Sequence, residues 1–239
     1  RCGRVRILRP RREDVPLEHQ AHRVIDRDVY RPGVLVHPAV AVKLLVFLRA
    51  ELIQLVAREL LQATKPRLVA IGGLSGTGKS LLARTLAPEI MPMPGAVVLR
   101  SDIERKAMFS VAETETLPKS AYTAEATANV YATLAAKARR VVAAGHSAIV
   151  DAVFAQPGER ADIAKAADSD EFTGLFLTAD LQSRLERVGA RTRDASDANT
   201  AIVQDQEKFE LGRINWPRVD ASGTPDETFV RARVALDLE

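Results

Sequence analysis

Residues 73–80 have the composition and spacing of a loop that binds phosphate groups. Their sequence, GLSGTGKS, matches the pattern G-x-x-x-x-G-K-[ST] and lies between an apolar run and a stretch of helical character. Glycines let successive backbone N–H groups point at one anion, which the N-terminus of the following helix also attracts. We expect Lys79 to bridge the β- and γ-phosphates of ATP or GTP and the Ser80 hydroxyl to bind Mg²⁺, whereas the alternative is a tight turn without a ligand. The residues expected to contact the nucleotide are Gly73, Ser75, Gly76, Thr77, Gly78, Lys79, Ser80 and Leu81.

Two aspartates follow apolar runs that have the character of buried strands. Asp102 comes shortly after residues 96–100, and Asp151 comes directly after residues 147–150. Ligands of parallel sheets lie beyond the carboxyl ends of the strands, so both side chains are expected beside the phosphate loop. Asp102 could accept the proton of an attacking hydroxyl, or it could only cap the next helix. Asp151 could position Mg²⁺, or it could only end a strand in a turn.

Arginines form the third group of residues suited to phosphate chemistry. Arg105 lies one helical turn after Asp102, on the same helix face, where it could hold an acceptor or stabilise charge. A second set precedes the polar stretch 194–199, and a segment of this kind could close over a nucleotide and place a guanidinium on the transferring phosphate. The alternative for this set is a solvated helix face, most readily for Arg184. The set comprises Arg184, Arg187, Arg191 and Arg193.

Alternating short apolar runs and longer helical patterns provide the framework for these residues. This alternation predicts a parallel sheet that is covered by helices on both faces. The expected strands are 67–71, 96–100, 147–150, 172–177 and 217–220. The expected helices are 79–87, 102–109, 121–144, 158–167, 180–188, 199–211 and 225–236.

The N-terminal part of the chain differs in character from the rest. Residues 1–38 contain several prolines and little periodicity, which indicates an irregular arm. Residues 39–65 form a helix and a linker, and the leucines along one helix face predict packing against the domain at 66–239. Charged residues interrupt this helix, which argues against a membrane span.

Composition and charge limit the class of protein. A chain of 239 residues is long enough for one α/β domain with a short extension. The net charge of +3 comes from residues 1–31, which hold nine arginines against five acidic residues, so the body of the chain is balanced and a nucleic-acid partner is disfavoured. The single cysteine, Cys2, excludes an internal disulfide framework and a cysteine-rich zinc site. With neither a signal peptide nor a membrane span expected, we predict a cytoplasmic protein.

Residues 66–237 resemble the P-loop small-molecule kinases and ATP-binding proteins related to gluconate kinase, chloramphenicol phosphotransferase, zeta toxin and polynucleotide kinase. In particular, they are similar to the ATP-binding domain that is fused to aminoglycoside-phosphotransferase-like domains in bacteria. The long helix through Tyr122 and Tyr131 contributes to the resemblance. The matching stretches are LVAIGGLSGTGKS, VVLRSDIERKAMF, AGHSAIVDAVFAQPGER and RTRDASDANTAIVQDQ.

The resemblance implies an α/β P-loop NTPase fold, a three-layer sandwich whose five-stranded parallel sheet has the order 2-3-1-4-5, here with an added N-terminal helix. It implies ATP and Mg²⁺ as cofactors, with Lys79 and Ser80 at the phosphates and Asp151 at the metal. It also implies Asp102 as the base on the acceptor side and Arg105 as its partner. The arginines that close over the nucleotide would be among Arg187, Arg191 and Arg193. Arg160 would match the family's arginine downstream of the third strand.

These expectations lead to an ATP-dependent phosphotransferase that acts on a hydroxyl of an unidentified small molecule. Two alternatives stay open, a polynucleotide 5′-hydroxyl kinase and a regulatory ATPase or nucleotide switch without an acceptor. Residues 1–65 do not contain an aminoglycoside-phosphotransferase-like domain, so such a domain is expected only as a separate partner.

Overall fold

The structure is a computed structural model that describes residues 38–61, 64–167, 171–190 and 196–238. The chain divides into two units, residues 1–57 and 58–239. Helix α2 (Pro38–Leu61) accounts for the described residues of the first unit. No helix among the described residues combines the length and the apolar character needed to cross a membrane. The site residues all belong to the second unit.

A five-stranded parallel sheet forms the centre of the second unit. Its strand order is β2-β3-β1-β4-β5, which confirms the expected α/β fold. The central strand β1 is buried along its whole length, as expected for an apolar run covered on both faces. The strands are β1 (Leu68–Gly73), β2 (Val97–Arg100), β3 (Ala148–Asp151), β4 (Phe172–Thr178) and β5 (Arg218–Asp220).

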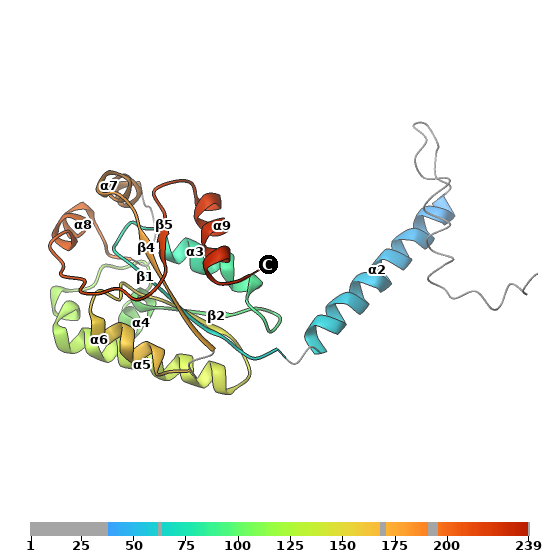
Figure 1. Cartoon of the computed structure of the whole chain (residues 1–239), viewed down its shortest axis with the longest axis horizontal. Helices are drawn as coiled ribbons and strands as arrows, with labels where there is room; N and C mark the ends of the chain where they lie inside the picture. The colour runs from blue at the N-terminus through green and yellow to red at the C-terminus, as the bar shows by residue number, and fades with distance from the viewer. Residues whose placement is uncertain (1–37, 62–63, 168–170, 191–195, 239) are drawn as a thin grey trace, which may run out of the picture. The chain divides into compact units, whose positions relative to one another are not determined.

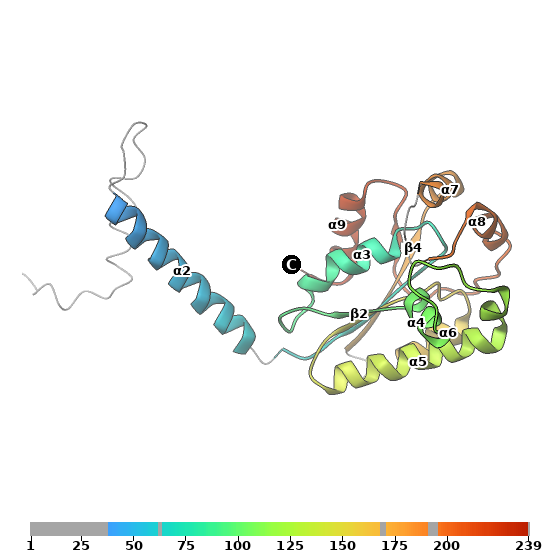
Figure 2. The same cartoon turned by 180° about the vertical axis from the view of Figure 1, so that it is seen from behind.

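Helices cover both faces of the sheet and complete three layers (Figures 1 and 2). On one face, α3 (Lys79–Leu86) and α9 (Pro225–Ala235) bury residues such as Leu82 and Ala232 against the sheet. On the other face, α5 (Ala124–Ala143) and α6 (Pro157–Ala164) bury Leu134 and Ile163. The remaining elements are η1 (Ala87–Glu89), α4 (Ser101–Met108), η2 (Lys119–Tyr122), α7 (Leu181–Gly189) and α8 (Thr200–Gln206).

Several helices differ in their bounds from the sequence expectation, and a physical reason is visible for two of them. The helix expected at 121–144 begins only at Ala124, because the Thr123 side chain accepts from the N–H of Ala126 and caps the helix there. The helix expected at 199–211 ends at Gln206, and the Leu211 carbonyl accepts from the Arg160 side chain instead of continuing a helical ladder.

One close contact shows how tightly the sheet is packed. Gly174 in β4 lies under the ring of Trp216, and a Cβ atom at this position would lie 2.2 Å from a ring carbon. The Trp216 ring also contacts Phe154 edge to face, with 5.2 Å between ring centroids. Glycine is therefore required in this strand so that the aromatic ring can cover it.

Candidate functional site

The carboxyl ends of three neighbouring strands carry the predicted site. The phosphate loop follows β1, Asp102 lies just beyond β2, and Asp151 is the last residue of β3. The register pairs Ile71 with Asp151 and Arg100 with Asp151, so the three strand ends lie level with one another. The sequence expectation that these residues lie at one edge of the sheet is confirmed.

The phosphate loop has the backbone geometry that its glycines allow. Gly76 and Gly78 have φ values of 86° and 90°, a region that other residues rarely adopt. The Leu74 carbonyl accepts from the Thr77 hydroxyl at 2.8 Å and from the Lys79 ammonium at 3.0 Å. Thr77 is 2% exposed. The loop is thus closed by its own side chains and leads directly into the N-terminus of α3.

Two helices hold the phosphate loop from outside. The N–H of Ser75 donates to the Gln206 side chain of α8 at 2.7 Å, and its carbonyl accepts from Nε of Arg184 in α7 at 2.9 Å. Arg184 is buried and also pairs with Glu207. The interpretation of Arg184 as part of a solvated helix face is therefore wrong, because its guanidinium binds a backbone carbonyl and a carboxylate.

Ser80, Asp151 and Arg100 form a compact polar cluster next to the loop. The Ser80 hydroxyl donates to Oδ2 of Asp151 at 2.5 Å, and Nη2 of Arg100 lies 3.1 Å from the Ser80 hydroxyl. Nε of Arg100 lies 3.4 Å from Oδ2 of Asp151. The Asp151 and Arg100 side chains are only 5% and 9% exposed, so the charges compensate each other away from water.

The donor set of this cluster fits Mg²⁺ better than a transition metal. Ser80 and Asp151 supply hard oxygen atoms, and within the described ranges no group of three or more His, Cys, Asp or Glu residues could hold a metal. Mg²⁺ is commonly held by one or two protein oxygens together with substrate phosphates. The two residues assigned to Mg²⁺ from the sequence are therefore adjacent and chemically suitable.

Asp102 lies in the first turn of α4, where Arg100 is the N-cap residue and no side chain makes a capping bond. Capping therefore does not explain this aspartate. Burial, followed by the neighbouring charge of Asp151, raises the pKa of Asp102, although the charges of Lys79 and Arg100 and a hydrogen bond with Ser196 oppose the rise. A carboxyl group with a raised pKa has the chemistry of a general base.

Arg105 lies on the same helix, and its guanidinium contacts η2 and the start of α5. Its Nη1 atom donates to the Ala121 carbonyl at 2.6 Å and to the Thr127 hydroxyl at 3.3 Å, and its guanidinium stacks on the Tyr122 ring. Arg105 is 7% exposed. In this arrangement it shapes the wall formed by η2 and the start of α5.

Arg160 likewise binds the backbone. It is buried and donates to the carbonyls of Phe154, Ala155, Leu211 and Arg213. Phe154 has a φ of 49°, which is strained for an aromatic residue, and its N–H and carbonyl are held by Tyr131 and Arg160. Arg160 therefore fixes the turn after β3.

A cavity of about 620 Å³ opens beside the phosphate loop. It is lined by Gly76, Gly78 and Leu81 on one side and by Arg187 and the first turn of α9 on the other. The Arg187 guanidinium donates to the carbonyls of Ser222 and Gly223 at 3.3 and 2.8 Å. The structure therefore brings Arg187 and the loop after β5 to the cavity beside the phosphate loop.

Arg191 and Arg193, the other two arginines assigned from the sequence, lie outside the described residues. Sequence reasoning missed two groups that the structure places at the site, Arg100 and Gln206. The position of Arg100 at a strand end was the only signal available for it, and Gln206 reaches the site through a contact between distant segments.

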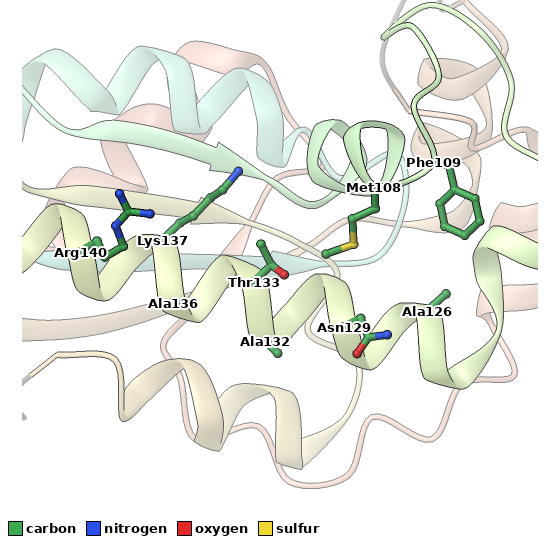
Figure 3. A pocket seen from close by; sticks show the side chains of 9 residues that line it. All are labelled: Met108, Phe109, Ala126, Asn129, Ala132, Thr133, Ala136, Lys137 and Arg140. Carbon is green, nitrogen blue, oxygen red and sulfur yellow. The ribbon is translucent and has the colours of Figure 1, made fainter.

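A second hollow lies between α4 and α5 (Figure 3). Its lining includes the exposed side chains of Met108 and Phe109, the small side chains of α5, and Lys137. It shares no lining residue with the cavity beside the phosphate loop.

Comparisons with known proteins agree with this fold. A family model described as "AAA domain" matches residues 68–211. A gluconokinase from Sinorhizobium meliloti 1021 superposes with a TM-score of 0.53 at 19% identity, over 72% of this chain and 93% of that one. A sugar kinase from Janibacter sp. HTCC2649 gives 0.56 at 20% identity, over 72% and 95%. The APS kinase of Mycobacterium tuberculosis, in complex with AMPPNP and APS, gives 0.51 at 22% identity, over 72% and 98%.

Curated relatives include uncharacterised proteins of Mycobacterium tuberculosis and Mycobacterium bovis. They are 29% identical over 184 residues, which cover 74% of this chain and 36% of theirs. The chain thus spans about a third of the length of the curated relatives that it matches.

Proposed function

Because the chain belongs to the AAA domain family and has a kinase-like P-loop fold, we propose that it is an ATP-dependent phosphotransferase. It moves the γ-phosphate of ATP to a hydroxyl group of a small molecule. The observation that carries this proposal is the meeting of a phosphate loop, a hydroxyl–carboxylate pair and a second carboxylate at three adjacent strand ends. These groups are Lys79, Ser80 with Asp151, and Asp102.

Each group has a separate task in the proposed reaction. Asp102 accepts the proton of the acceptor hydroxyl as its oxygen approaches the γ-phosphorus. Lys79 neutralises charge on the β- and γ-phosphates while the bond to ADP breaks. Ser80 and Asp151 would hold Mg²⁺, which when bound supplies positive charge to the phosphate oxygens. We assign a further role at the transferring phosphate to Arg191 and Arg193, on the sequence resemblance alone.

The nucleoside is proposed to occupy the cavity beside the phosphate loop. Leu81 and Phe229 provide apolar contact there, and Arg187 lies at its edge. The volume of about 620 Å³ falls within the range of pockets that bury small ligands. Gly76, Gly78 and Ser80 of the phosphate loop also line this cavity, so a nucleotide there would have its phosphates beside the loop.

A transfer assay with labelled ATP tests this function. The purified chain is incubated with Mg²⁺, labelled ATP and a panel of sugars, hydroxylated antibiotics and oligonucleotides with a free 5′-hydroxyl. Transfer to a small molecule that is lost in the Asp102→Asn variant supports the proposal. Transfer only to oligonucleotides would favour a polynucleotide kinase. ATP turnover that persists in Asp102→Asn without any acceptor would favour a nucleotide switch.

The relatives' greater length allows a further part of the proposal. We propose that a domain similar to aminoglycoside phosphotransferases works together with this one, as the sequence resemblance implies. Binding of such a domain to this chain, measured by calorimetry with and without ATP, tests the pairing.

A further inference from the structure

Arg100 contacts both residues to which the proposed function assigns Mg²⁺. It is the last residue of β2, and the parallel register pairs it with Asp151 at the end of β3. Its Nη2 atom donates to the Ser80 hydroxyl at 3.1 Å, and its Nε atom lies 3.4 Å from Oδ2 of Asp151. A single guanidinium group therefore holds the oxygens of both residues.

These oxygens are joined to each other as well as to Arg100. The Ser80 hydroxyl donates to the same Oδ2 atom of Asp151 at 2.5 Å, and the side chains of Arg100 and Asp151 are both buried. A buried carboxylate needs a compensating positive charge, and the guanidinium supplies one to Asp151. The three side chains thus form a closed set of contacts in which the charge of the aspartate is already balanced.

Mg²⁺ requires the same two oxygens. It binds hard oxygen ligands in a small octahedral shell, so Ser80 would have to turn a lone pair towards the metal and away from its present donor, Arg100. The metal and the guanidinium are also both cations, and they repel each other at short range. Arg100 in its present contacts and a metal ion on Ser80 and Asp151 therefore exclude each other.

We propose that Arg100 is a positioning residue that keeps Ser80 and Asp151 from binding free Mg²⁺ and releases them only to Mg²⁺ that arrives with a nucleotide. The inference rests on the proposed function, which assigns the metal to these two residues. A triphosphate brings negative charges that offset the repulsion between the metal and the guanidinium, and its oxygens complete the shell of the metal. The same oxygens are suitable acceptors for the displaced guanidinium.

The alternative is an ion pair with a structural role alone. In that case, removal of the Arg100 charge lowers the stability of the chain and leaves its affinity for a metal ion unchanged. In the proposed case, the same removal makes the two oxygens available, so the metal alone binds more tightly. Even at the dielectric constant of water, a unit charge about 4 Å from a divalent cation weakens its binding by more than about 10-fold.

Titration of the full chain with Mn²⁺ alone, followed by electron paramagnetic resonance, separates the two cases without any nucleotide. Mn²⁺ prefers the same oxygen ligands as Mg²⁺, which should compete with it. Arg100→Gln removes the charge and keeps a hydrogen-bond donor, so we expect it to bind Mn²⁺ at least about 10-fold more tightly than the unaltered chain does. Arg100→Met, which also lacks the donor, should show a similar gain. Arg100→Lys keeps the charge and should bind Mn²⁺ as weakly as the unaltered chain.

Two further variants locate the effect. Arg233→Met is the matched control, because Nε of Arg233 lies 3.5 Å from Oε2 of Glu89, but these side chains are 32% and 39% exposed and belong to η1 and α9. This variant should leave Mn²⁺ binding unchanged. When Arg100→Gln is combined with Asp151→Asn, the gain should disappear, since the metal then lacks its carboxylate ligand.

Circular dichroism establishes that each variant is folded, and the two uncharged variants serve as replacements for each other. Equal Mn²⁺ affinity of the unaltered chain and an uncharged variant would overturn the inference, as would a gain that persists with Asp151→Asn. Saturable binding of Mn²⁺ to the unaltered chain at micromolar concentrations would overturn it without any variant. Phosphate transfer is measured separately: an active chain whose Arg100→Gln variant shows no gain refutes this inference alone, and a gain in a chain that transfers no phosphate refutes the proposed function alone.

Discussion

The substitution Gly76→Ala tests how the phosphate loop is packed. The matched substitution Gly145→Ala separates the cost of backbone strain from the cost of a steric clash. Gly76 and Gly145 have the same φ of 86°. A Cβ atom at Gly76 would lie 2.6 Å from the Arg184 carbonyl oxygen, whereas a Cβ atom at Gly145 meets nothing within 4 Å. Both variants therefore carry the strain of a left-handed conformation, about 1–2 kcal/mol. Only Gly76→Ala adds overpacking against backbone, about 1–3 kcal/mol more.

We therefore expect Gly76→Ala to lower the free energy of unfolding by about 2–5 kcal/mol and Gly145→Ala by about 1–2 kcal/mol. Urea unfolding without nucleotide, followed by circular dichroism, measures both. Because the clash moves α7 away from the loop, Gly76→Ala should also weaken ATP binding in calorimetry, and Gly145→Ala should not. Equal destabilisation of the two variants would refute the close packing of the loop on Arg184.

Three further predictions follow from the charges. Lys106→Met leaves Asp197 buried without its cation and should lower the free energy of unfolding in urea by about 3–5 kcal/mol. Lys165→Met, at an exposed ion pair with Asp162, should lower it by less than about 1 kcal/mol. Similar losses in the two variants would contradict the burial of the Lys106–Asp197 pair. Since the folded chain raises the pKa of Asp102 above its ordinary value of 3.8, the charged carboxylate lowers stability as pH rises through the folded pKa. Asp102→Asn should consequently be more stable than the unaltered chain at neutral pH, and the difference should vanish at pH values below 3.8; a constant difference would show that the raised pKa is not the cause. Asp151→Asn should remove most of the additional thermal stabilisation that Mg²⁺ gives in the presence of ATP, and an unchanged Mg²⁺ effect would exclude this residue from the metal site.

The phosphate loop could be predicted because it depends on consecutive residues. The strand order could be predicted because it is a property of the whole fold family that the sequence resembles. The loop depends on glycines and polar side chains within eight consecutive residues, 73–80. The five apolar runs indicated the parallel strands, and the resemblance supplied their order, which places Asp102 and Asp151 at one edge. Those side chains therefore lie where the sequence predicted them.

The orientation of the arginines could not be predicted from spacing. Arg105 and Arg184 each have a helical position compatible with a ligand, but their guanidinium groups bind backbone carbonyls that come from other elements. Such partners become available only when the chain has folded, because a buried carbonyl that lacks a helical or strand partner needs a donor. Asp197 illustrates the same limit, since its three partners lie about 75–91 residues earlier in the chain.

The hydrogen bond from Lys79 to the Leu74 carbonyl bears on which anions the loop can accept. This carbonyl oxygen is an acceptor for one of the three N–H donors of the ammonium group, so a phosphate that binds Lys79 competes with an acceptor in the same loop. A lone monophosphate brings few contacts beyond those it displaces, whereas a triphosphate spans the whole turn and gains several amide donors at once. We therefore expect this internal hydrogen bond to favour the binding of long polyphosphate chains over small inorganic anions.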